Sequence, residues 1–316
     1  MIIKVPFRSL ALILAVTASQ ISAQTVSTPV VGFQKISMPQ GGVSLGPTFV
    51  KASVFSGTVT ISGNTATLSA GSLPGSLGST AFSDRTNYPR YYAEVVSTNS
   101  PFYGYNFDID SNTSNSLVSP NMPVGLSGTV LITIRPHVTL GDLGASSLND
   151  GDSVNFVNDP SGDQATFYAV AGDWYDSGFN PGYSHKPIYP GEAVIFAGQS
   201  GTVTVTLSGQ VKTTPTAVPL FMSSYANLVA AINPSGSVSW ANQGLQNALN
   251  DGAAFTVYTS DGTFVEDSTY YTISGQIYDS SFSPTASSIP VQSGTGINIG
   301  SLDTDKVIIL PGVQVN

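Results

Sequence analysis

The chain of 316 residues contains no cysteine and only two histidines, and charged residues occupy just 9% of its positions. Without cysteine there are no disulfide bonds, so burial of apolar side chains must hold the fold together. A structural zinc site needs three or four Cys, His or carboxylate ligands, and His137 and His185 lie in separate segments, which argues against zinc. Because charge is scarce, solubility must depend on uncharged hydrogen-bonding side chains.

Basic residues are the scarcer of the charged groups. Ten Lys and Arg stand against 19 Asp and Glu, and two of the ten, Lys4 and Arg8, lie at the amino terminus. The other basic residues are scattered along a chain whose acidic excess repels phosphate groups. We therefore expect no nucleic-acid partner and no binding to an anionic membrane surface, because both need clustered Lys and Arg.

The amino terminus has the order of a secretory signal. Lys4 and Arg8 precede the apolar run Leu10–Val16, and small residues end at Ala23. This order predicts a signal peptide cleaved near Ala23. The apolar run is shorter than the roughly 20 residues that cross a bilayer. We expect a secreted protein, located in the periplasm, at the cell surface or in the medium, with no membrane insertion after cleavage.

Motifs for catalysis are few. The sequence has no His-Glu-x-x-His helix and no glycine-rich loop ending in Lys-Ser or Lys-Thr. Glycoside hydrolysis needs two facing carboxylates, and we expect all three glutamates, Glu94, Glu192 and Glu266, to lie on the solvated surface. We assign no catalytic residue and expect a protein that is not an enzyme.

Short β-branched and aromatic runs separated by Gly, Asn, Asp and Pro recur along the chain. Residues 57–61 and 65–68 flank Ser62-Gly63-Asn64, a pattern typical of a β-hairpin. Helical periodicity is confined to residues 240–249. The patterns predict an all-β protein with a small β-barrel or sandwich domain, two related β-sandwich-like modules and at most one or two short helices.

The chain also contains a self-similarity that suggests an internal repeat. Leu148-Asn149-Asp150-Gly151 returns as Leu249-Asn250-Asp251-Gly252, and Trp174–Pro181 is matched at nearly the same spacing by Ile277–Pro284. Several matches in one order favour two copies of a module. The predicted organisation is a signal peptide (1–23), an N-terminal strand (24–48) that is either separate or part of the first module, a small β domain (49–135), module 1 (136–215) and module 2 (216–316).

Three motifs carry a resemblance to a known family: Pro29-Val30-Val31-Gly32-Phe33, Phe107-Asp108-Ile109-Asp110-Ser111-Asn112-Thr113 and Ile134-Arg135-Pro136-His137-Val138-Thr139-Leu140. With them the chain resembles an uncharacterised family of secreted proteins seen mainly in Verrucomicrobia-like bacteria. The resemblance implies export and a shared architecture. It implies no activity, cofactor or catalytic residue.

One metal hypothesis follows from spacing. Asp108, Asp110 and Asn112 have the Asp-x-Asp-x-Asn spacing that opens a calcium loop. Thr113 stands where the loop needs Gly, and Ser119 stands where it needs Glu, so a strand end running into a turn is the alternative. Apart from this calcium hypothesis we expect no cofactor.

Aromatic residues give the one lead to a binding surface. Trp174, Tyr175, Tyr183 and Tyr189 lie among Asn, Asp and Gly in segment 172–189, a composition that suits stacking on sugar rings. The alternative is that they are core residues and cross-strand pairs. Trp174 corresponds to Ile277 in the second copy, which leaves Trp174 as the residue free to be functional.

Together these observations predict an exported, non-catalytic structural or binding protein. Its expected partner is a polysaccharide or a surface protein. The alternative is a carbohydrate-binding or carbohydrate-degrading protein, which the aromatic segment would serve.

Overall fold

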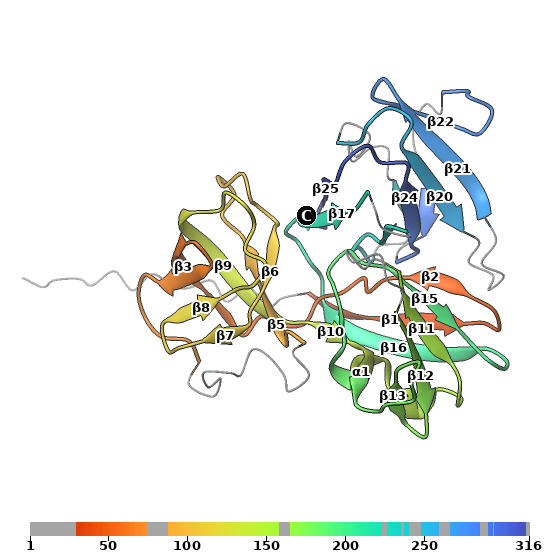
Figure 1. The fold of residues 1–316 in the computed structure, drawn as a ribbon, viewed down its shortest axis with the longest axis horizontal. Helices are drawn as coiled ribbons and strands as arrows, with labels where there is room; N and C mark the ends of the chain where they lie inside the picture. The colour runs from red at the N-terminus through yellow and green to blue at the C-terminus, as the bar shows by residue number, and fades with distance from the viewer. Residues whose placement is uncertain are drawn as a thin grey trace, which may run out of the picture.

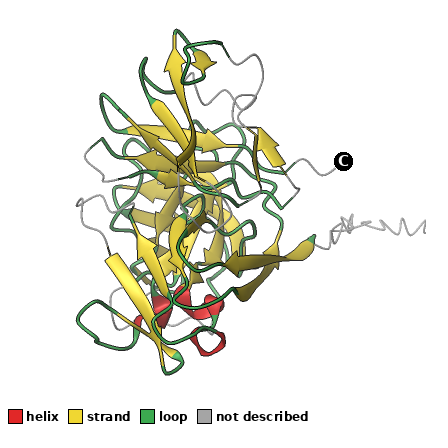
Figure 2. Cartoon of the chain, turned by 90° about the vertical axis from the view of Figure 1, so that its right-hand side faces the viewer, coloured by secondary structure: helices red, strands yellow, loops and turns green. Residues whose placement is uncertain are grey.

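The computed structural model describes residues 30–74, 88–157, 165–222, 226–234, 237–239, 248–258, 266–284, 290–292 and 294–313. The helical residues among them form one short α-helix and two 3-10 turns, which confirms the predicted all-β class. Figure 2 shows these helical residues gathered at one end of a molecule built of strands. The predicted signal peptide and residues 240–247 of the predicted helix lie outside the described residues. No helix in the described ranges is long and apolar enough to span a bilayer.

Three units meet at a common junction (Figure 1). The insert domain, residues 55–136, is a seven-stranded antiparallel sheet in the order β6-β5-β9-β3-β4-β8-β7. Its strands are β3 (Phe55–Ser62), β4 (Thr65–Leu68), β5 (Tyr91–Val95), β6 (Asn106–Asp108), β7 (Ser111–Asn112), β8 (Ser116–Val118) and β9 (Gly128–Pro136).

The predicted hairpin is part of this sheet. Strands β3 and β4 pair from Val59↔Leu68 to Ser62↔Thr65, and Gly63 in the turn has a φ of 57°. That left-handed conformation is accessible to glycine without steric cost. Alternation along β3 buries Val59 and Ile61 in the core of the insert domain while their neighbours face solvent.

The first module takes strands from both sides of the insert domain. Its main sheet has the order β13-β12-β11-β15-β2, and the pair β1-β16 covers one face of it. Its strands are β1 (Val31–Met38), β2 (Val43–Leu45), β10 (Val138–Thr139), β11 (Ser153–Phe156), β12 (Ala165–Val170), β13 (Asp173–Tyr175), β14 (Pro187–Ile188), β15 (Val194–Ala197) and β16 (Val203–Gln210). The helical turns are α1 (Leu140–Leu143), η1 (Ala145–Ser147) and η2 (Tyr183–His185).

The second module has a main sheet of order β18-β24-β20-β21-β22, with the pair β17-β25 beside it. Its strands are β17 (Thr216–Leu220), β18 (Leu228–Val229), β19 (Ser237–Ser239), β20 (Ala254–Tyr258), β21 (Glu266–Ile273), β22 (Gln276–Tyr278), β23 (Pro290–Gln292), β24 (Ile297–Gly300) and β25 (Lys306–Leu310). In chain order, β20, β21, β22 and β24 take the same places in their sheet as β11, β12, β13 and β15 take in theirs.

The two modules also share a strained turn. Phe179 and Phe282 both have a φ of 58°, a conformation that side chains with a Cβ rarely adopt. Phe179 stacks on Tyr168 and Phe282 stacks on Tyr271, with ring planes 12° and 14° apart. Both phenylalanines are exposed, so each module presents one aromatic ring at the same place in its fold.

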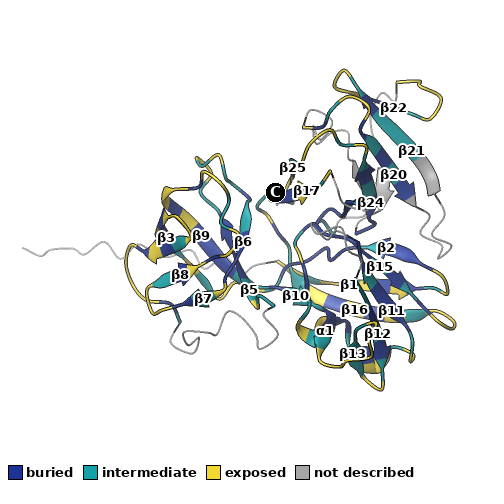
Figure 3. Cartoon of the chain, in the orientation of Figure 1, coloured by how far each residue is buried: buried dark blue, intermediate teal, exposed yellow. Residues whose placement is uncertain are grey.

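The three units contact one another through backbone hydrogen bonds as well as side chains. The N–H of Ala217 donates to the carbonyl of Gly104 in the insert domain, at 2.9 Å. Between the modules, Ala193 N–H donates to the Leu228 carbonyl at 3.0 Å, and Gly296 N–H donates to the Ser44 carbonyl at 2.8 Å. Figure 3 shows buried residues running through the strands of each unit and the segments between them.

Trp174 does not lie where we expected it. Its side chain is fully buried in the core of the first module, with Phe167 and Phe196 in the same cluster. Strand register gives the reason. Trp174 on β13 pairs with Ala169, and Ile277 on β22 pairs with Thr272, so the two residues occupy equivalent inward positions in their modules. The surface role predicted for Trp174 is wrong.

Trp174→Ala should therefore destabilise the protein. Loss of a buried indole leaves a cavity and is expected to lower the free energy of unfolding by about 3–5 kcal/mol, measured by urea denaturation. The matched control is Phe179→Ala, because the Phe179 ring is 70% exposed. Equal effects of the two substitutions would contradict the placement of Trp174.

Candidate functional site

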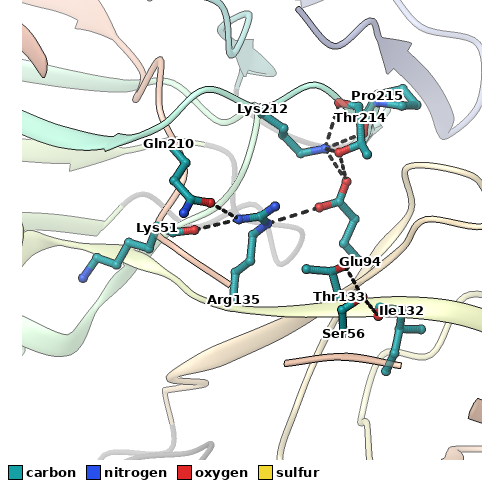
Figure 4. A network of polar contacts seen from close by, with 10 residues as sticks. All are labelled: Lys51, Ser56, Glu94, Ile132, Thr133, Arg135, Gln210, Lys212, Thr214 and Pro215. Carbon is teal, nitrogen blue, oxygen red and sulfur yellow. Dashed lines mark hydrogen bonds and ion pairs between the residues drawn. The ribbon is translucent and has the colours of Figure 1, made fainter. Parts of the chain in front are cut away.

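A buried ion pair lies where the three units join (Figure 4). Glu94 of β5 is 0% exposed, and Lys212, which follows β16, is 1% exposed. Lys212 Nζ lies 2.5 Å from Glu94 Oε1 and also donates to Thr214 Oγ1 at 2.7 Å and to the Pro215 carbonyl at 2.5 Å. The Thr214 hydroxyl donates to Glu94 Oε1 as well. Every donor of the ammonium group therefore has an acceptor.

Arg135, near the end of β9, extends this network to the first module. Its Nε lies 3.6 Å from Glu94 Oε2. Its Nη1 donates to the carbonyl of Lys51 at 2.9 Å and to Gln210 Oε1 at 3.0 Å. Lys51 precedes the insert domain and Gln210 ends β16, so the network joins both connections of the insert domain to the segment that leads into the second module.

The expected solvation of the glutamates is wrong for two of the three. Glu94 is buried because Lys212 and Arg135 compensate its charge. Glu192 is 7% exposed, and its Oε2 accepts a hydrogen bond from the Tyr189 N–H at 2.9 Å. The side chain of Glu266 lies outside the described residues. Burial lowers the pKa of Lys212, and Glu94 opposes that effect.

A cavity of about 280 Å³ lies beside this network. All three units line it: Tyr92, Asn106, Phe107, Asp108 and Asn121 from the insert domain, His137, Tyr189, Pro190 and Glu192 from the first module, and residues 217–219 with Phe221 from the second. The cavity therefore depends on the relative placement of the three units.

Asp108 is the polar centre of the cavity wall. Its Oδ1 lies 3.1 Å from His137 Nε2. Its Oδ2 accepts from Asn121 Nδ2 at 3.0 Å and from the Tyr189 hydroxyl at 3.2 Å. The His137 ring lies between two aromatic rings, with centroids 4.9 Å from Tyr92 and 5.1 Å from Tyr189. Strand ends from two units thus fix one carboxylate and one imidazole.

Three polar atoms of this wall are buried without a partner. His137 Nδ1, Asn106 Oδ1 and the Tyr92 hydroxyl make no hydrogen bond to any residue that the structure describes. Burial raises the pKa of Tyr92, and the charge of Glu94 adds to the effect. Burial also raises the pKa of Tyr189, with further contributions from Asp108 and Glu192. Both hydroxyls are therefore protonated at neutral pH.

The predicted calcium ligands have separate surroundings. Asp108 is held by its three donors, Asp110 is exposed, and Asn112 is buried on β7 with its Nδ2 donating to the Thr113 carbonyl at 3.0 Å. Among the described residues no group of three or more His, Asp or Glu side chains is placed to hold a metal ion. The calcium hypothesis stays a prediction.

The four aromatic candidates are not brought together. Trp174 is in the core, and Tyr175 follows it on β13, so its side chain leaves the opposite face of the sheet. Tyr183 covers the core, with its ring centroid 5.0 Å from that of Phe167. Tyr189 alone lines the cavity.

One segment has the Gly-x-Ser-x-Gly spacing of a hydrolase nucleophile elbow, Gly42-Val43-Ser44-Leu45-Gly46. Ser44 is 1% exposed and lies inside β2, paired with Ile195. A nucleophile elbow is a sharp turn between a strand and a helix, so this match is a β-strand and carries no nucleophile.

No protein-family model matches the chain, and no curated protein or solved structure is found to be similar to it. The resemblance to a family of secreted proteins therefore stays a prediction.

Sequence reasoning missed several residues of the site: Tyr92, Asn106, His137, Glu192 and Phe221 at the cavity, and Lys212 in the ion network. One usable signal was the rarity of charge. In a chain with eight basic residues after the predicted signal peptide, Lys212 next to the start of the second module is a candidate for a structural ion pair. No sequence signal identifies its partner.

Glu94→Gln should lower the free energy of unfolding by about 3–5 kcal/mol, because it leaves the buried charge of Lys212 uncompensated. The double variant Glu94→Leu/Lys212→Met should cost less than Glu94→Gln, since it removes both charges. Urea denaturation of the single and double variants measures this coupling.

The control pair is Lys306 and Asp303, whose side chains are 22% and 57% exposed. Lys306→Met should change the free energy of unfolding by less than about 1 kcal/mol. If Glu94→Gln has an equally small effect, Glu94 is not the buried centre described above.

Asp176 gives a prediction on pH. Hydrogen bonds lower the pKa of Asp176 from 3.8 to about 2. Those from Asn180 have the largest effect, and the one from the Tyr183 hydroxyl comes next. A carboxyl group whose pKa is lower in the folded state than in the unfolded state stabilises the folded state at pH values above its unfolded pKa. This stabilisation is lost as pH falls from about 4 to about 2. The NMR titration of the Asp176 carboxyl carbon should have its midpoint near 2, and Tyr183→Phe should raise it. A midpoint unchanged by Tyr183→Phe would contradict the assignment.

Proposed function

We propose that this chain is an exported, non-catalytic binding protein whose ligand occupies the cavity between the three units. One observation carries the proposal: His137 Nδ1 and Asn106 Oδ1 are buried and unpartnered among the described residues, in a cavity with aromatic walls. A buried polar atom without a partner is costly, and a ligand would supply the missing hydrogen bonds. Pockets with apolar walls and a few converging polar groups are typical of small-molecule sites.

The arrangement around His137 favours binding over catalysis. Its Nε2 is taken by Asp108, and its Nδ1 has no Ser or Thr hydroxyl bonded to it among the described residues. A nucleophile activated by a histidine needs such a contact. Ser44 is inside a strand, away from this role. The proposal of export rests on the predicted signal peptide.

A second candidate, carbohydrate degradation, has one observation in its favour. Two carboxylates, Asp108 and Glu192, line the same cavity. Glycosidases use a pair of carboxylic groups on either side of the bond that is cut. Three donors already occupy Asp108, which leaves it poorly suited to accept or donate a proton, so we rank this activity second.

The test is a binding screen against the secreted protein, followed by chemical-shift perturbation in NMR. Neutral sugars, amines and carboxylic acids of one-ring size form the panel. Ala217→Leu fills the cavity without removing a polar group. It should lower the affinity for any ligand found by about tenfold or more, which corresponds to about 1.4 kcal/mol. Val307→Leu, on the exposed face of β25, is the matched control.

A ligand that binds the wild type and Ala217→Leu equally would place the site elsewhere. Release of reducing sugar from a glycan, abolished by Asp108→Asn, would establish the second candidate in place of the first.

A further inference from the structure

Charge restricts what the cavity can hold. Its described lining includes two carboxylates, Asp108 and Glu192, and no Lys or Arg. Lys212 and Arg135 of the adjacent network bind Glu94, which leaves that network with one net positive charge against the two carboxylates of the lining. Charges a few ångströms apart near a protein surface interact strongly. An anionic ligand would be repelled, and a cation would be attracted.

Two of the three unpartnered atoms, His137 Nδ1 and Asn106 Oδ1, are hydrogen-bond acceptors, and the third, the Tyr92 hydroxyl, can donate or accept. Asp108 takes hydrogen bonds from Asn121 and Tyr189 and is acceptor-only as a carboxylate, so His137 Nε2 carries the hydrogen between them. In a neutral imidazole the other nitrogen, Nδ1, is then an acceptor. Asn106 Oδ1 is an acceptor as well. The ligand group must therefore bring donors, and an ammonium group brings three N–H donors and no acceptor.

The walls suit a cation too. Tyr92, Phe107, Tyr189 and Phe221 supply aromatic rings around the cavity. The face of an aromatic ring attracts a cation within about 6 Å, and the attraction is stronger where water is excluded. A neutral sugar can stack on such rings and donate hydrogen bonds to carboxylates, but it brings no positive charge to offset theirs. Rings, acceptors and negative charge together favour a positively charged donor.

From these observations we infer that the cavity binds the ammonium group of a small organic amine. The inference rests on the proposed binding function and specifies its ligand class. A cavity of about 280 Å³ is slightly smaller than the roughly 300–1,000 Å³ of most small-molecule sites, which limits the ligand to a single ring or a short chain.

Three probes of one shape and different charge test the inference: benzylamine, benzyl alcohol and benzoate. In NMR titrations of the wild-type protein at neutral pH, benzylamine should bind at least about tenfold more tightly than benzyl alcohol, and benzoate should not bind. A higher salt concentration should weaken the binding of benzylamine and leave the binding of benzyl alcohol unchanged.

Two variants separate charge from shape. Glu192→Gln keeps an acceptor for the Tyr189 N–H. It should lower the affinity for benzylamine about tenfold and leave the affinity for benzyl alcohol unchanged. Phe221→Leu removes an aromatic wall and tests the same site without altering its charge, so the inference stays testable if one variant fails to fold.

Benzyl alcohol or a neutral monosaccharide that binds the cavity as tightly as benzylamine would overturn the ammonium inference and leave the binding function standing. If none of the panel shifts the signals of His137 or Tyr189, both the inference and the proposed function fail.

Discussion

The contact between Glu94 and Lys212 is the interaction on which the rest of the structure depends. Two charges lie at a place where water is excluded, and each would be strongly destabilising alone. Glu94 comes from the insert domain, and Lys212 comes from the segment that leaves the first module for the second. Arg135 binds the same carboxylate and the segment that enters the insert domain. A single buried centre thus fixes three units that the chain connects through short segments.

The cavity lies beside that centre. No single unit encloses it, because its rings and acceptors come from β5, β6, the residue between β9 and β10, and the segments that follow β14 and β17. Tyr92 and Glu94 lie two residues apart on β5, so the strand that carries the ion pair also carries a wall of the cavity. A change that moves the second module therefore also changes the cavity. Under the proposed function, ligand binding would be linked to the assembly of the three units.

More of the fold than of the candidate site could be predicted from the sequence. Alternating strands and the glycine turn between β3 and β4 follow from local preferences, and these act along the chain. The correspondence between Trp174 and Ile277 marks a core position and not a site, because both side chains are buried and apolar. Spacing alone singles out Asp108, but its partners His137 and Tyr189 come from the first module. Glu94 and Lys212 meet only through the packing of separate units, which no local pattern specifies.

Calorimetric unfolding of the wild-type protein tests the central claim most directly. If the buried network makes the three units one cooperative structure, heating should give a single transition in which the calorimetric and van't Hoff enthalpies agree. Separate transitions for the insert domain and the modules would show that the units are stable independently, and would contradict the account.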